Sequence, residues 1–110
     1  MSSHFRYILI IICFSFFQLS LLKAKEINVC KKCEVKSIKK AIAKAEDGDV
    51  ICISNGIYKE ENLIIDKALS LIGDGFPVID GQNKYEVISI KANHVSLQNL
   101  KIIKIYGIQR

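Results

Sequence analysis

The feature that most constrains the fold is a change of hydrophobic period within residues 37–81. Apolar residues recur at three and four positions up to residue 45, and from Asp49 the period becomes two. Short β-branched runs follow, with Gly, Asp and Asn turns between them. We expect strands at residues 49–53, 63–65, 69–72, 78–79, 87–90, 95–97 and 100–105, after an edge strand around Ile27 and Val29. Like strands recur about every twenty residues, which predicts the coils of an all-β solenoid.

The residues before the strands predict one short amphipathic helix. Its buried face is expected to carry Val35, Ile38, Ala41, Ile42 and Ala45. Ser37 is the expected N-cap, and Gly48 offers a left-handed exit at the other end. A parallel solenoid exposes its first hydrophobic rung, so we expect the helix to lie across that end as a cap.

The strand pattern alone leaves a second architecture open. Two-residue loops would make the same strands antiparallel and give a small sandwich. Residues 63–65 and 102–103 are consecutive apolar residues, so these strands have no polar side that would face solvent. Residues 49–53 are also fairly apolar on both faces. Strands covered on two faces are typical of parallel sheets, so the pattern favours the coil.

Residues 1–24 are predicted to be a secretory signal peptide. His4 and Arg6 precede an uncharged apolar run at residues 7–22, and Ala24 supplies a small residue for cleavage. Leu22 is bulky for its place before that site, so an N-terminal membrane anchor is the alternative. Residues 25–110 then form the N-terminal cap and first coils. They are short for a stable solenoid, and we expect a truncated, N-terminal piece of a longer protein.

The charge excludes one class of partner. The chain carries a net charge of +5, and loss of Arg6 and Lys23 with the signal would leave +3. The polar side of the expected helix carries four lysines, at positions 36, 39, 40 and 44. We interpret this side as a solvent-exposed face. Because neither arginine nor aromatic residues interleave with them, we predict no nucleic-acid binding.

Cys30 and Cys33 are the sharpest chemical candidates. Two thiolates three residues apart can share a soft metal ion such as Cu(I), and the lysines between them favour the thiolate form. In an oxidising compartment, structural disulfide formation is the more ordinary reading, and redox exchange is a third. Cys52 leaves the pairing open, because it could link to either cysteine.

Other candidate residues read mainly as turn chemistry. His94 lies in a turn with Asn93, and an exposed turn residue is the expected role rather than a copper ligand. The loop at residues 73–75 lacks the lysine and the following helix of a phosphate-binding loop. Asp66, Asp74 and Asp80 stand beside Gly or Lys at strand ends, so we expect no catalytic residues here.

An ordered set of these residues resembles a known family. The set comprises Ser37-Ile38-x-x-Ala41-Ile42-x-x-Ala45, Gly48-Asp49-x-Ile51, Asn55-Gly56-x-Tyr58-Lys59-Glu60, Ile65-Asp66-Lys67-x-Leu69-x-Leu71-Ile72-Gly73 and Val78-x-Asp80-Gly81. It resembles the N-terminal end of right-handed parallel β-helix proteins with the pectin-lyase-like fold. Within them it is most similar to the NosD family, periplasmic proteins for copper-site maturation of nitrous oxide reductase.

The resemblance implies a fold and a role. The fold is a right-handed parallel β-helix, and the role is that of a non-enzymatic periplasmic accessory protein for copper-site assembly. Its partners would be the nitrous oxide reductase maturation machinery and a membrane transporter. The same opening occurs in carbohydrate-active β-helix enzymes, so the alternative is the non-catalytic start of a secreted pectin lyase or pectinesterase, with a glycan as partner.

Overall fold

The computed structural model describes residues 24–83 and 86–103. Residues 1–23, nearly all of the predicted signal peptide, lie outside these ranges, as do residues 104 and 105 of the last expected strand. Within the described ranges, no helix combines the length and the apolar character that a membrane crossing requires.

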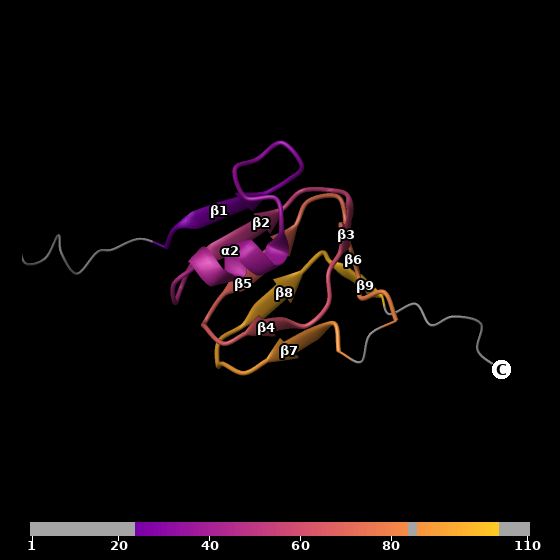
Figure 1. Cartoon of the computed structure of the whole chain (residues 1–110). Helices are drawn as coiled ribbons and strands as arrows, with labels where there is room; N and C mark the ends of the chain where they lie inside the picture. Colours follow the sequence, from indigo (N-terminus) through magenta and orange to yellow (C-terminus); the bar gives the residue numbers. More distant parts are fainter. Residues whose placement is uncertain (1–23, 84–85, 104–110) are drawn as a thin grey trace, which may run out of the picture.

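The described chain is mostly β and winds as a parallel solenoid of about three turns (Figure 1). The first sheet has the order β1-β2-β5-β8, the second β3-β6-β9 and the third β4-β7. Their strands are β1 (Glu26–Val29), β2 (Val50–Ile53), β3 (Ile57–Lys59), β4 (Leu63–Ile65), β5 (Ser70–Gly73), β6 (Val78–Asp80), β7 (Ile88–Ile90), β8 (Ser96–Gln98) and β9 (Lys101–Ile103). Every pairing between strands is parallel. The antiparallel sandwich is therefore excluded for these residues.

The core is a stack of aliphatic side chains from successive turns. Ile27 pairs with Ile51, Ile51 with Leu71, and Leu71 with Leu97, so one inward row runs the length of the first sheet. The two middle residues are fully buried, whereas Leu97 on the last turn is only half-buried. Because inward and outward positions alternate along each strand, this register places Cys52 and Ile72 on the outer face.

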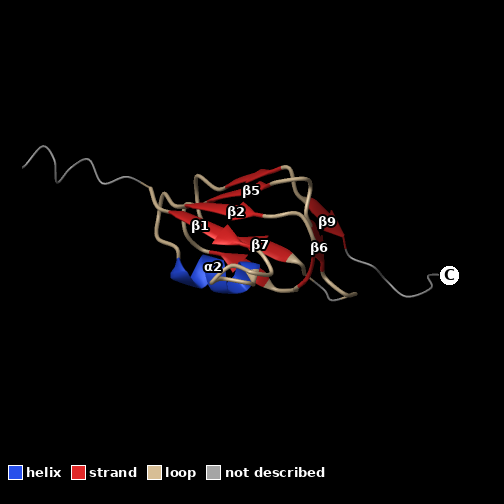
Figure 2. Ribbon diagram, turned by 90° about the horizontal axis from the view of Figure 1, so that it is seen from above, coloured by secondary structure: helices blue, strands red, loops and turns tan. Residues whose placement is uncertain are grey.

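Helix α2 (Ile38–Lys44) lies against the first turn of the solenoid (Figure 2). It buries Ile38, Ala41 and Ile42, the face that the sequence predicted. Its main packing partners are β1, β2 and β4, which are the first strands of the first and third sheets.

The structure corrects four details of the sequence-based prediction. Strand β3 was not expected, because Asn55-Gly56 ends one strand and the next begins immediately afterwards. The helix ends at Lys44, with an extended Ala45 as its C-cap, and Gly48 takes its φ of 90° in the turn beyond. The outer face of β2 is half-buried rather than covered. The spacing of like strands is not constant, since β5 begins 20 residues after β2 and β8 begins 26 residues after β5.

Candidate functional site

The two cysteines of the lead-in form a disulfide in the structure. The Cys30 and Cys33 sulfurs are bonded, and the Cα atoms are 5.0 Å apart. The loop is also closed by the backbone, because Cys33 N–H donates to the Cys30 carbonyl and Cys30 N–H donates to the Val35 carbonyl, both at 3.3 Å. In this oxidised form neither sulfur is a thiolate, so a copper contact at Cys30 and Cys33 requires prior reduction.

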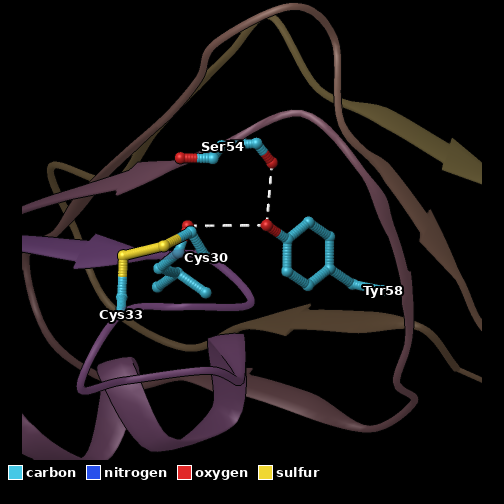
Figure 3. Close-up of a disulfide and its surroundings, with 5 residues drawn as sticks. Cys30, Cys33, Ser54 and Tyr58 are labelled. Atoms are coloured by element: carbon cyan, nitrogen blue, oxygen red, sulfur yellow. Dashed lines mark hydrogen bonds between the residues drawn. A yellow bond between two sulfur atoms is a disulfide. The ribbon is translucent and has the colours of Figure 1, made fainter.

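Tyr58 lies beside this loop, and its hydroxyl connects the ends of two strands of the first turn (Figure 3). Its ring is in the core, with 8% of the residue exposed, and its hydroxyl lies 2.8 Å from the Ser54 carbonyl and 3.4 Å from the Val29 carbonyl. The single O–H is thus shared between the last residue of β1 and the end of β2. Burial, and secondarily the Glu60 carboxylate, raises the pKa of the Tyr58 hydroxyl. It stays a donor at any ordinary pH.

Cys52 is separate from the disulfide. It is a half-buried free thiol on the outer face of β2, in register with Asn28 and Ile72. The pairing of Cys52 with Cys30 or Cys33, which the sequence left open, does not occur in the structure. Burial raises the pKa of the Cys52 thiol, and the Glu26 carboxylate adds to this effect. A thiol in this setting is a weak nucleophile and a weak metal ligand at neutral pH.

The N-terminus of α2 is closed by two side chains. The Ser37 hydroxyl accepts from Lys40 N–H at 3.0 Å, which confirms the predicted N-cap. The Glu60 carboxylate, from the loop after β3, accepts from Ile38 N–H at 2.8 Å and from Lys39 N–H at 3.0 Å. Together they satisfy three amides that have no partner inside the helix, and the negative charge meets the positive end of the helix dipole.

The C-terminus of α2 is closed by the opposite charge. The Lys67 ammonium, from the turn after β4, lies 2.8 Å from the Ile42 and Ala45 carbonyls and 3.3 Å from the Ala43 carbonyl. Carbonyls of the last helical turn lack intrahelical donors and carry the negative end of the dipole. Glu60 and Lys67, which lie either side of strand β4, therefore hold the two ends of the helix.

The corner between α2 and β2 is organised by two aspartates. Asp49 is 4% exposed, and its carboxylate accepts from Glu46 N–H at 2.8 Å and from Lys25 N–H at 2.9 Å. These backbone donors, that of Glu46 first, hold the pKa of Asp49 below its usual value of 3.8. Asp47 accepts from Ala68 N–H at 2.9 Å, which ties the corner to the next coil.

The remaining candidates are placed apart from this cluster. His94 is exposed with a φ of 61°, in the turn before β8, as the sequence predicted. Asp66 and Asp74 are exposed, and Asp80 uses its carboxylate to accept from Gln82 N–H at 2.9 Å, a turn contact. Among the described residues, no group of three or more His, Cys, Asp or Glu side chains is arranged to hold a metal ion.

The chain belongs to the parallel β-solenoid class. The contacts described above hold α2 and the neighbouring turns in place, so the site that they define is structural. In comparisons with known proteins, no family model, no curated protein and no solved structure matches the chain. Sequence reasoning identified Ser37 as the N-cap but named Asp49, Tyr58, Glu60 and Lys67 only as members of a motif. Each of these four side chains contacts a residue 21 to 29 positions away, as in Tyr58 with Val29 and Glu60 with Lys39, and no local pattern predicts such pairs.

Proposed function

We propose that residues 25–103 form the N-terminal cap and first coils of a right-handed parallel β-helix whose role is that of a non-enzymatic scaffold. The observation that carries this proposal is the attachment of α2 by Glu60 and Lys67. Both side chains form hydrogen bonds with the ends of the helix, and the helix packs on strands from the beginning of the solenoid. A helix fixed in that position covers the apolar rung that a parallel solenoid would otherwise expose.

The scaffold proposal also accounts for the carboxylates at the turns of the chain. Asp47, Asp49 and Asp80 accept hydrogen bonds from backbone N–H groups of turns. Carboxylates used in this way hold the chain's corners and are not presented to a substrate. We therefore do not propose the glycan-cleaving alternative for these turns.

For the particular role we propose periplasmic copper-site assembly for nitrous oxide reductase. It is supported by the resemblance of the ordered motif to the NosD family and by the predicted export signal. Copper would be cargo, and Cys30 with Cys33 would contact it only after reduction of their disulfide, since two thiolates suit Cu(I). The maturation machinery and a membrane transporter are the proposed partners.

The test is Cu(I) titration of the full-length chain after reduction, with a competing chelator as the readout. We expect one copper per chain, lost when Cys30 and Cys33 are both changed to Ser and kept when Cys52 is changed to Ser. Binding that survives loss of both cysteines would remove them from the proposed site. Failure to bind at all would count against the copper role while leaving the scaffold proposal standing.

A further inference from the structure

The first layer of the solenoid has a positive net charge, whereas the residues that follow it have a negative one. Residues 25–44, which comprise β1, the disulfide loop and α2, hold seven lysines and two glutamates. Residues 45–110 hold six lysines, one arginine and nine acidic residues. The net charges are thus +5 on the first layer and −2 on the residues that follow it. A solvated surface needs no such separation, and charge of one sign gathered at one end points to a partner of the opposite sign.

Most of this positive charge is not neutralised within the described molecule. Lys25 lies 3.8 Å from Glu46, and Lys44 lies 4.0 Å from Glu34, both on exposed side chains. Such exposed pairs contribute little. The other five lysines, at positions 31, 32, 36, 39 and 40, are exposed and make no ion pair with another described residue.

Several of these lysines surround one groove. Lys31, Lys36, Lys39 and Lys59 line a cavity of about 430 Å³ together with Glu60 and Glu61. Glu60 is already committed to the helix N-terminus, where it accepts from two backbone amides. The groove is therefore cationic on balance, and it has room for a phosphate-sized anionic group.

The chemistry of the layer selects among polyanions. Its cations are all lysine, with no arginine among residues 25–44, and the exposed part of the layer has no aromatic residue. Lysine is a compact, hydrated point charge that suits a diffuse field of phosphates, and the layer lacks the aromatic platforms on which single-stranded nucleic acids stack. In the alternative in which residues 1–24 are retained as a membrane anchor, the uncharged apolar run at residues 7–22 ends three residues before Lys25. Three residues span at most about 10 Å, comparable to the Debye length at moderate salt.

We propose that the first layer of the solenoid, residues 25–44 with Lys59, is a docking surface for an anionic lipid bilayer. The lysines contribute an electrostatic attraction to the headgroups, and the later coils, which are acidic, are directed away from the membrane. This inference is independent of the proposed copper role.

The test is vesicle flotation of the full-length chain. Vesicles of phosphatidylcholine alone measure any binding through the apolar run, and vesicles that also contain phosphatidylglycerol add the electrostatic contribution. We expect stronger binding to the anionic vesicles, weakened by salt. The double variant Lys36→Gln with Lys39→Gln should reduce that preference about fivefold for each lysine removed. Lys39 lies in α2, where glutamine has a helix propensity similar to that of lysine, and Lys36 is exposed and outside the helix, so we expect the fold to be kept.

The matched control removes the same charge from the last turn. Lys91→Gln with Lys101→Gln should leave the preference for anionic vesicles unchanged. Equal binding to both kinds of vesicle would overturn the proposal, as would an equal loss in the control. Retention on polygalacturonate beads without a preference for anionic vesicles would also overturn it, and would assign the surface to an acidic glycan.

Discussion

At the scale of single residues, Tyr58 shows how a side chain named in a sequence motif can have a purely structural role. Its ring fills the core, and its hydroxyl joins the ends of β1 and β2. The aromatic body supplies buried area, and the polar tip donates to the Ser54 carbonyl and lies near the Val29 carbonyl, which also accepts from Ser54 N–H.

Removal of the Tyr58 hydroxyl should weaken the first turn without distorting it. Tyr58→Phe keeps the ring and leaves the Ser54 carbonyl without this donor, so we expect a loss of about 1 kcal/mol in the free energy of unfolding. Urea denaturation of the full-length chain measures it. Ser89→Ala, on a half-buried hydroxyl of β7, is the control and should change stability much less. Equal effects of the two variants would contradict the role assigned to Tyr58.

Asp49 gives the molecule a defined response to acid. Its folded-state pKa lies below the usual 3.8, so its contribution to stability is fully present above that value and is lost as the pH falls toward the lower folded pKa. Asp49→Asn should therefore lower stability near neutral pH and make the loss of stability below about pH 4 shallower. Urea midpoints across that range check this, with exposed Asp66→Asn as the control. A parallel, merely shifted profile would show that Asp49 is not the titrating group.

At the scale of elements, α2 depends on contacts from outside itself. A helix of seven residues is too short to be stable alone in water, so its ends must be held by the coil. Glu60 and Lys67 provide complementary charges at the two ends, and the buried face provides the packing.

Loss of either terminal contact should loosen the helix. Glu60→Gln and Lys67→Met should each cost about 1 kcal/mol in the free energy of unfolding, because each leaves helix-end groups with weaker partners or none. Amide hydrogen exchange of residues 38–45 should rise in both variants. Glu61→Gln and Lys91→Met are the neighbouring and distant controls. Unchanged protection in the Glu60 and Lys67 variants would contradict the attachment of α2 described above.

The sequence predicted the helix and the strands better than the contacts between them. The helix face, the Ser37 N-cap and most strands follow from local period and turn chemistry, which a single sequence displays. Strand β3 was missed because Ile57 is exposed and Tyr58 is its one buried residue, so three residues give too little alternation. The contacts of Glu60 and Lys67 were missed because they join residues more than twenty positions apart, and only the winding of the chain brings them together.

At the scale of the whole molecule, the solenoid is unequal at its two ends. The first turns bury Ile51, Ile53 and Leu71 completely, whereas Leu97 is half-buried and Ile102 is 43% exposed on the last turn. The beginning of the described chain is also the basic end, and the later coils are acidic. Packing and charge therefore change together along the axis, which gives each end a different surface.

The parallel register of the first sheet is the central claim, because the core row, the outer face and the place of α2 all depend on it. Native Cys52 offers a direct probe, since Ile72 is its register partner on β5 and Ser70 is two residues away on the same strand. Neighbouring Cα atoms in parallel strands are about 4.8 Å apart, within disulfide reach, whereas a partner displaced by two residues lies at about 8 Å, beyond it.

Disulfide mapping of the oxidised full-length chain is the measurement. Ile72→Cys should link to Cys52 while Cys30 remains linked to Cys33, and Ser70→Cys should leave Cys52 free. A link from Ser70→Cys to Cys52, with none from Ile72→Cys, would contradict the register of β2 with β5 on which the core row and the outer face depend.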